Sequence, residues 1–263
     1  MESEDTLDVV QTVIECDGEY LLAKRSKDSY WEFIGGKVKE DENLRKAAIR
    51  EINEETDLDL EQNNLASFRR GDSYLSEDDS RFRLNPVYFG ISEIKKNSMT
   101  IEGLSKEHTD FEWIELSDFD QYDTLGQFKA LEHLDIVNGR VAIAAVRKGN
   151  EFLVVKRSSE NSTPGKWGFV SGGIGSGEDS KEAAVRELKE ETGLKAEPVE
   201  TGDFYIGKGE KGFWRLEPVL LEYEEGTVDL NWELSDYRWV EPNEFAELDS
   251  IGRFKAVEKL GIN

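Results

Sequence analysis

One hexapeptide pattern occurs twice in this chain, as Arg50-Glu51-Ile52-Asn53-Glu54-Glu55 and as Arg186-Glu187-Leu188-Lys189-Glu190-Glu191. Residues three and four positions apart lie on one face of an α-helix, so the three glutamates of each copy share a face. Like charges at this spacing repel each other by roughly 0.2–0.5 kcal/mol per pair. A bound divalent cation would remove that repulsion, and carboxylate oxygens are ligands that Mg²⁺ and Mn²⁺ prefer. The alternative is an exposed acidic helix face, but it does not explain why the same pattern occurs twice.

The repetition extends well beyond the hexapeptides. Trp31 and Arg50 recur as Trp167 and Arg186, both at an offset of 136 residues. Further matching segments are Glu19-Tyr20-Leu21 with Glu151-Phe152-Leu153, Phe82-Arg83-Leu84 with Trp214-Arg215-Leu216, and Phe128-Lys129-Ala130 with Phe254-Lys255-Ala256. Two homologous domains of ordinary size are therefore expected, at residues 1–136 and 137–263. The joint near residues 135–139 is too short for a free linker, so we expect the domains to pack as an internal pseudo-dimer, and a further homo-oligomer is compatible with the sequence.

Composition limits the compartment and the partners. Cys16 is the only cysteine, so no internal disulfide can form and a reducing cytoplasm is the expected compartment. Apolar runs are far shorter than the ~20 residues of a membrane helix, which predicts no membrane partner. Residues 1–136 carry 16 Lys and Arg against 33 Asp and Glu, and residues 137–263 carry 17 against 24. This acidity disfavours long nucleic acid, which binds through many cationic contacts with phosphate, and favours a small nucleotide substrate that brings its own metal.

Glycine, glutamate and arginine have the same spacing in both copies. Gly36 is followed after five residues by Glu42, and Arg50 follows after seven more. The second copy repeats this spacing with Gly172, Glu178 and Arg186. The pattern resembles the Nudix box, GX5EX7REUXEEXGU with U a bulky hydrophobic residue, which marks the MutT-like Nudix hydrolase superfamily. The resemblance covers both copies and implies an α/β fold with two tandem α/β/α sandwich domains, each built on a mixed β-sheet.

Local signals predict the elements that lead into each glutamate helix. Strands are expected at residues 7–15 and 19–24 around an Asp17-Gly18 turn, which is a strong hairpin signal. Their counterparts are residues 140–147 and 151–156, and short strands at 31–34 and 167–170 lead into glycine loops. We expect the helices to begin after the N-caps Asn43 and Asp179, with Glu182 completing a capping box in the second copy. Each domain is expected to end in another helical segment, from Ser117 or Asn243 onward.

The resemblance implies a role for each residue of the box. The expected ligands of Mg²⁺ or Mn²⁺ are the helix glutamates Glu51, Glu54, Glu55, Glu187, Glu190 and Glu191. Arg50 and Arg186 are expected to orient them through charge-assisted hydrogen bonds. The general base varies across the family, and the candidates are Glu54 and Glu190 in the helices and Glu107 and Glu233 in a later loop. For the two loop residues, a solvated acid without a catalytic role is the alternative.

Each copy departs from the family pattern at one position. A main-chain carbonyl before the box is a metal ligand in the family, and this position falls on Gly35 in the first copy but on Ser171 in the second. Carbonyl ligation in the second copy is therefore in doubt. Asp57 occupies the place of the glycine that follows the first helix, where a left-handed backbone is expected, at a cost of about 1 kcal/mol for a residue other than glycine.

Substrate contacts are less constrained. The candidates for phosphate binding are the arginines Arg25, Arg83, Arg157 and Arg215, for which a strand-edge charge is the alternative. The candidates for base stacking are Tyr74, Tyr205, Phe82 and Trp214, for which packing within a sheet is the alternative.

The function expected from the resemblance is metal-dependent hydrolysis of a phosphoanhydride bond. The substrate would be a nucleoside diphosphate linked to another moiety, as in a nucleoside triphosphate, nucleotide sugar, ADP-ribose or dinucleoside polyphosphate. The alternative is a nucleotide-binding sensor in which one or both domains bind without turnover. A purely structural duplication would leave the box carboxylates unused.

Overall fold

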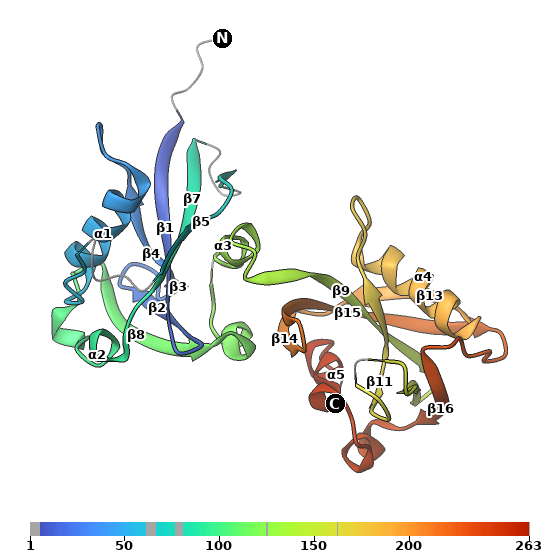
Figure 1. Ribbon diagram of the computed structural model, residues 1–263. Coiled ribbons are helices and arrows are strands. Elements are labelled where there is room, and N and C mark those ends of the chain that lie inside the picture. The colour runs from blue at the N-terminus through green and yellow to red at the C-terminus, as the bar shows by residue number, and fades with distance from the viewer. Residues whose placement is uncertain (1–5, 62–66, 77–80, 125, 162, 263) are drawn as a thin grey trace, which may run out of the picture. The chain divides into compact units, whose positions relative to one another are not determined.

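One arrangement of strands and helices occurs twice along the chain (Figure 1). The computed structural model describes residues 6–61, 67–76, 81–124, 126–161 and 163–262. Contacts within the chain divide it into an N-terminal unit, Met1–Val137, and a C-terminal unit, Asn138–Asn263.

The N-terminal unit is built around the helix that carries the first box. Its strands are β1 (Leu7–Cys16), β2 (Glu19–Arg25), β3 (Trp31–Glu32), β4 (Ile34–Lys37), β5 (Ser67–Arg70), β6 (Tyr74–Leu75), β7 (Phe82–Gly90) and β8 (His108–Glu115). Its helices are α1 (Leu44–Glu55), α2 (Glu93–Lys96) and α3 (Phe128–His133), with 3₁₀ turns η1 (Ile101–Gly103) and η2 (Leu116–Gln121).

The C-terminal unit repeats the order of the strands and of the box helix, without counterparts of α2 and η1 among the described residues. Its strands are β9 (Val137–Lys148), β10 (Glu151–Arg157), β11 (Trp167–Gly168), β12 (Val170–Gly173), β13 (Lys195–Thr201), β14 (Tyr205–Gly209), β15 (Gly212–Glu225) and β16 (Leu234–Val240). Its helices are α4 (Ser180–Thr192) and α5 (Lys255–Lys259), with 3₁₀ turns η3 (Pro242–Glu247) and η4 (Gly252–Phe254).

Both units contain a mixed sheet with the same strand order. The order is β3-β2-β1-β7-β5 in the N-terminal unit and β11-β10-β9-β15-β13 in the C-terminal unit. In the first sheet β1 runs parallel to β7 and antiparallel to β2 and β4. The predicted hairpin between β1 and β2 is confirmed, with φ of 52° at Asp17 and 86° at Gly18, the positive values that a tight primed turn requires.

Two hydrophobic cores cover the two faces of the sheet in the C-terminal unit. Alternate residues of a strand point to opposite faces. Ala142 and Ala144 of β9 therefore join the core under α4, whereas Ala145 joins the aromatic core on which α5 packs. Helices thus cover the sheet on both faces, which confirms the predicted α/β/α sandwich.

The predicted starts of the box helices are confirmed. Asn43 is the N-cap of α1 and accepts a hydrogen bond from the Lys46 amide at 3.0 Å. Asp179 caps α4 and accepts from the Glu182 amide at 2.9 Å, while the Glu182 carboxylate accepts from the Asp179 amide at 3.0 Å. The α4 helix therefore begins with the complete capping box that the sequence predicts.

The end of α1 differs from the expectation. The left-handed backbone predicted at Asp57 is wrong, because Asp57 does not have a positive φ. The C-cap of α1 is Thr56, which is extended with φ of −137°. The Asp57 carboxylate instead accepts hydrogen bonds from the Thr100 hydroxyl at 2.7 Å and the Thr100 amide at 3.2 Å. In the second copy, Gly193 ends α4 with φ of 70°, as a glycine after a helix commonly does.

The C-terminal helical segments also differ in kind. The segments expected from Ser117 and Asn243 onward begin as the 3₁₀ turns η2 and η3, and the α-helices α3 and α5 follow only later. Each predicted strand before a glycine loop is two short strands, with Phe33 or Phe169 between them. No helix among the described residues is long and apolar enough to span a membrane.

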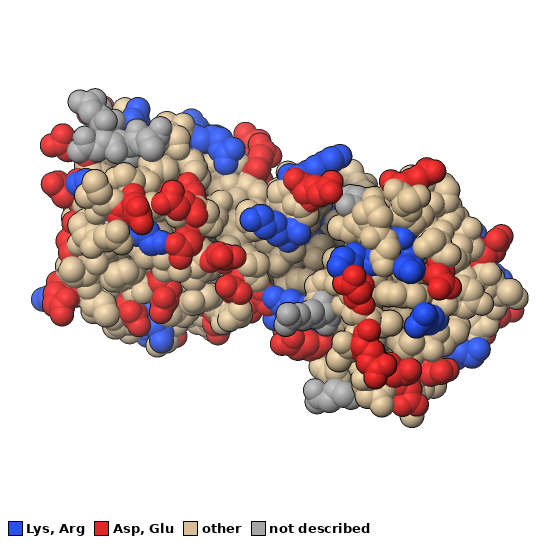
Figure 2. All heavy atoms as spheres, turned by 60° about the horizontal axis from the view of Figure 1, so that its bottom comes forward, with Lys and Arg blue, Asp and Glu red and all other residues tan. Residues whose placement is uncertain are grey.

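Charged side chains of both signs are interspersed on the surface that Figure 2 shows. Acidic side chains are the more numerous in the sequence, with 57 Asp and Glu against 33 Lys and Arg.

We expect Asp179→Ala to lower the free energy of unfolding of the C-terminal unit by about 1 kcal/mol, because the first turn of α4 loses its acceptor. Hydrogen exchange of the α4 amides in the full chain measures the effect locally. Lys189→Ala, at an exposed position of the same helix, is the matched control and should change protection little. Equal loss of protection in the two variants would contradict the role of the cap.

Candidate active site

An arginine joins the box loop to the box helix in the N-terminal unit. The Arg50 guanidinium donates two hydrogen bonds to the Glu42 carboxylate, at 2.9 and 2.8 Å, and one to the Lys37 carbonyl at 2.9 Å. It also donates to Glu51 at 2.7 Å and to Glu54 at 3.1 Å. These bonds hold the pKa of the Glu42 carboxyl below its usual range and raise that of Arg50. One side chain thus holds three carboxylates from two segments, Glu42 of the loop and Glu51 and Glu54 of the helix.

The same arrangement occurs in the C-terminal unit. Arg186 donates to Glu178 at 2.8 and 3.0 Å, to Glu187 at 2.5 Å and to the Gly173 carbonyl at 2.8 Å. Its guanidinium lies 3.7 Å from the Glu190 carboxylate, a looser contact than that of Arg50 with its counterpart. Hydrogen bonding to Arg186 lowers the pKa of Glu178 to about 2.

The first glycine of each box is required by the first glutamate of the helix. A Cβ atom on Gly36 would lie 2.2 Å from Glu51 Oε1, and one on Gly172 would lie 1.9 Å from Glu187 Cδ. Neither glycine has a positive φ. The glycine therefore serves the close approach of a carboxylate to the loop.

The last glutamate of each helix is buried. Glu55 is 6% exposed and Glu191 is 4% exposed. Burial, reinforced by the charges of Glu51, Glu107 and Glu32, raises the pKa of Glu55 to about 9. Burial and the charge of Glu233 raise the pKa of Glu191 to about 8. Among the buried side-chain atoms, Glu55 Oε2 has no hydrogen-bond partner.

These carboxylates suit a divalent cation chemically, although they are not gathered into a finished cage. No group of three or more His, Cys, Asp or Glu side chains within the described residues is positioned to hold a metal ion. Arg50 and Arg186 engage the other helix glutamates. The buried oxygen of Glu55 without a partner and the mutual repulsion of the acids are what a hard cation would relieve.

Histidine faces the buried glutamate in the N-terminal unit. His108 Nδ1 lies 3.6 Å from Glu55 Oε2, and His108 Nε2 lies 3.2 Å from Glu32 Oε1. Glu32 in turn lies 3.6 Å from Arg25, which also pairs with Asp28 at 3.1 Å. A chain of polar side chains therefore leads from the α1 helix to the arginine at the end of β2.

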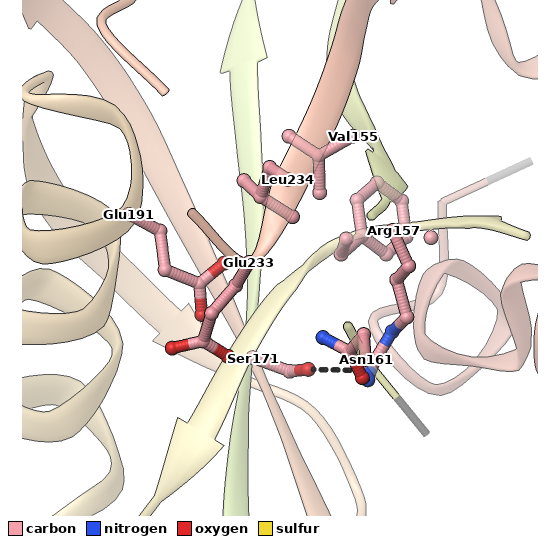
Figure 3. A pocket seen from close by; sticks show the side chains of 9 residues that line it. Val155, Arg157, Asn161, Ser171, Glu191, Glu233 and Leu234 are labelled. Atoms are coloured by element: carbon pink, nitrogen blue, oxygen red, sulfur yellow. Dashed lines mark hydrogen bonds between the residues drawn. The ribbon is translucent and has the colours of Figure 1, made fainter. Parts of the chain in front are cut away.

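Arginine faces the buried glutamate in the C-terminal unit (Figure 3). A small cavity of about 20 Å³, room for about one water molecule, is lined by Arg157, Asn161, Ser171, Glu191 and Glu233 among others. Arg157 donates to Asn161 at 2.6 Å and to Ser171 at 3.2 Å. Its positive charge partly offsets the rise in the pKa of Glu191, and its own pKa is lowered by burial.

The structure brings together only part of the predicted substrate site. Arg157 lines a cavity with Glu191 of the box helix α4, and Arg25 lines a second cavity with Glu32 and Gly35. Arg83 lies 3.6 Å from Asp8, and Arg215 lies 2.9 Å from Glu217 with its guanidinium over the Phe204 ring. These two arginines are thus held by neighbouring side chains of the sheet, in accord with the strand-edge alternative.

The remaining candidates have distinct positions. Glu54 and Glu190 have side chains 53% and 59% exposed, so water reaches them. Glu107 and Glu233 lie near enough to the buried glutamates to raise their pKa. Gly35 pairs with Gln11 in the sheet, and a Cβ there would lie 2.3 Å from the Val10 carbonyl oxygen.

Sequence reasoning missed two of these contacts. His108 and Glu32 were not candidates, although they lie against Glu55. A weak signal existed, because His108 is one of only two histidines and directly follows Glu107, a candidate base.

A comparison with protein families agrees with the repeated box. The NUDIX domain model matches residues 6–134 and 138–260, and the chain therefore belongs to the Nudix family. The model matches each copy separately, so the protein contains two tandem Nudix regions.

Relatives match one region at a time. The CTP pyrophosphohydrolase of Escherichia coli strain K12 is 46% identical over 57 residues, which are 20% of this chain and 42% of that protein. The RNA pyrophosphohydrolase of Dinoroseobacter shibae is 37% identical over 109 residues, 34% of this chain and 67% of that protein. Among solved structures, the MutT protein of Methanosarcina mazei Go1 has a TM-score of 0.40 and 23% identity, covering 46% of this chain and 90% of that one. The match with the first of these relatives thus spans less than half of its length.

We expect Glu55→Gln to raise the free energy of unfolding of the metal-free protein at neutral pH by about 1–3 kcal/mol. The substitution removes a buried carboxyl whose ionised form has no hydrogen-bond partner at Oε2 and several acidic neighbours. Urea denaturation in the presence of a chelator measures the change. Glu54→Gln, one residue away with an exposed side chain, is the control and should be nearly neutral. A destabilised Glu55→Gln variant would contradict this account of the buried carboxyl.

Proposed function

We propose that this protein is a metal-dependent pyrophosphohydrolase that cleaves small nucleotides in which a nucleoside diphosphate is linked to another moiety. The observation that carries the proposal is the arginine-held set of glutamates, present in both units with one buried carboxylate in each. Burial of an ionised carboxylate is costly to the fold, and a buried glutamate occurs at the same place in both units.

The residues that would hold Mg²⁺ or Mn²⁺ lie on the box helices. They are Glu51, Glu54 and Glu55 with the Gly35 carbonyl in the N-terminal unit, and Glu187, Glu190 and Glu191 in the C-terminal unit. When bound, the cation supplies the positive charge that neutralises a diphosphate and makes a nearby water more acidic.

The chain's own residues position the reacting groups. Arg50 and Arg186 fix the rotamers of the first and second helix glutamates. Glu54 and Glu190 are exposed to water, and we assign to them the role of proton acceptor for the attacking water. Arg25 and Arg157, which line the neighbouring cavities, would bind a phosphate oxygen of the substrate.

Charge and the relatives support a small nucleotide. The relatives include proteins named CTP pyrophosphohydrolase, RNA pyrophosphohydrolase and dihydroneopterin triphosphate diphosphatase, whose names share hydrolysis of a pyrophosphate linkage. The excess of acidic residues in this chain opposes an extended polyanion. We propose residues 1–136 and 137–263 as the two domains, acting in the cytoplasm.

The test is product analysis with Mg²⁺ or Mn²⁺ on a panel of nucleoside triphosphates, nucleotide sugars, ADP-ribose, dinucleoside polyphosphates and 5′-triphosphorylated RNA. We expect cleavage of at least one small nucleotide by the wild type. Activity should fall by about 100-fold or more in Glu55→Gln/Glu191→Gln, since a metal ligand is lost in each unit. The two single variants assign the activity to one unit or to both.

Glu200→Gln, at an exposed position of β13, controls for the loss of a surface charge and should retain full activity. Nucleotide binding without cleavage across the panel would replace the proposed hydrolase with a sensor. Cleavage that survives in the double variant would contradict the assigned site.

We expect Gly172→Ala to weaken binding of Mn²⁺ by the C-terminal unit by about tenfold, because the new Cβ displaces the Glu187 carboxylate. Calorimetric titration in the Glu55→Gln background isolates that unit. Gly173→Ala is the matched control, because no atom lies within 4 Å of a Cβ built there. Equal affinities of the two variants would show that the position of Glu187 does not matter for the metal.

A further inference from the structure

The N-terminal unit contains a cavity of about 260 Å³, lined by residues of β1, β2 and β4 and by residues at the start of α3. Its walls include Arg25, Glu32 and Gly35, which belong to the proposed reaction site, and Gln11, Tyr74 and Gln127, which do not. The cavity therefore continues from the reaction site to a group of neutral polar side chains. At the strand position that corresponds to Gln11, the C-terminal unit has the apolar residue Ile143.

We propose that the two units discriminate bases differently, with Gln11 and Gln127 of the N-terminal unit reading the hydrogen-bonding edge of the nucleobase, and Ile143 giving the C-terminal unit an apolar surface at the equivalent place. The inference rests on the proposed nucleotide hydrolase and adds to it the residues that determine specificity in one unit.

The two glutamines form a connected network in the sheet. Gln11 Nε2 donates to Gln127 Oε1 at 3.0 Å, and Gln11 Oε1 accepts from the Tyr74 hydroxyl at 2.6 Å. Gln127 Oε1 also accepts from the Phe33 amide at 3.1 Å. Gln11 is 6% exposed and Gln127 is 8% exposed. Each amide is thereby held in one orientation at the wall of the cavity.

The C-terminal unit keeps the frame of this site but replaces the glutamine. Ile143 pairs with Ser171 in the sheet as Gln11 pairs with Gly35. Tyr205 pairs with Leu216 as Tyr74 pairs with Leu84. The ammonium groups of Lys129 and Lys255 lie over the rings of Tyr74 and Tyr205 at 5.9 and 5.2 Å, respectively.

Ile143 packs against an aromatic core instead of making hydrogen bonds. This core contains Phe169, Tyr205 and Phe254, and the Phe169 and Phe254 rings are 5.0 Å apart. Because the frame is shared, the exchange of Gln11 for Ile143 changes the recognition chemistry at that strand position, and the aligned counterpart of Gln127 is Arg253.

Size and chemistry indicate which part of a nucleotide enters the cavity. At about 260 Å³ the cavity is slightly smaller than the roughly 300–1,000 Å³ of sites that enclose a whole small molecule. It suits one nucleobase, with the phosphates of the same nucleotide extending towards Arg25. The network uses one N–H and one lone pair of the Gln11 amide, which leaves a donor beside an acceptor, the pattern with which glutamine pairs with a base edge. Gln127 Oε1 already accepts two hydrogen bonds, so its amide would act as a donor.

A different explanation is that the network only fastens α3 to the sheet, because Gln127 directly precedes that helix. The two explanations differ in what the loss of Gln11 does. A fastening role predicts lower stability with unchanged base preference. A reading role predicts that the preference among bases is lost even in a variant that folds normally.

The experiment is calorimetric titration of the full chain, with Mg²⁺ present, with AMP, GMP, CMP, UMP and ribose 5-phosphate. These probes contain no phosphoanhydride bond, so the result does not depend on hydrolysis. The variants are Gln11→Met, which keeps the length of the side chain without its hydrogen bonds, and Gln127→Met. Gln121→Met, at an exposed glutamine that does not line the cavity, is the matched control. The melting temperature of each variant shows whether it folds.

We expect the wild type to prefer one base over another by about tenfold or more, and to bind that nucleotide more tightly than ribose 5-phosphate. In Gln11→Met or Gln127→Met the ratio of affinities between the preferred and the other bases should fall to roughly threefold or less, whereas Gln121→Met should keep the wild-type ratio. An unchanged ratio in folded Gln11→Met, or no base preference in the wild type, would overturn the proposal. Failure of the hydrolase proposal would instead appear as absent cleavage in the panel, with this base preference intact.

Discussion

The bidentate contact between the box arginine and the glutamate at the end of the loop is the interaction on which each site depends. Arg50 binds Glu42 through two nitrogens and uses its remaining donors for the helix glutamates and the Lys37 carbonyl. A guanidinium presents five N–H donors in one plane, so it can satisfy a loop carbonyl and several carboxylates at once. A lysine carries the same charge but lacks that fork, and could not fix two segments at defined angles.

Most of what could be predicted from the sequence involves residues near one another in the chain. The spacing of the box identified the helix, its caps and the arginine-glutamate contacts, because these lie within one turn or one loop. The end of α1 escaped prediction because Asp57 bonds to Thr100, which is remote in sequence. Likewise Gln11 forms a hydrogen bond with Gln127, 116 residues away in the sequence, and no local sequence pattern predicts that pairing. Long-range packing selects these partners.

The duplication shows which features the chemistry of the site constrains and which it does not. The loops, arginines and glutamates of the boxes have closely similar contacts in both units. Their surroundings differ, because His108 faces Glu55 in one unit and Arg157 acts on Glu191 in the other. A nearby cation favours an ionised carboxylate, and the charge of Arg157 accordingly opposes the rise in the pKa of Glu191 that burial causes.

Both units nevertheless retain the buried glutamate, although an isolated protein would be more stable without it. Stability alone would favour a neutral residue at this position, since an ionised carboxylate loses its hydration on burial. A feature that opposes folding and occurs in both copies is best explained by what it binds. The glutamate helices are therefore the shared part of the function. The units differ at two positions that line a cavity in one of them, at Gln11 against Ile143 and at Leu234 against His108. The two domains therefore differ more in the residues that would select a ligand than in those of the proposed hydrolytic step.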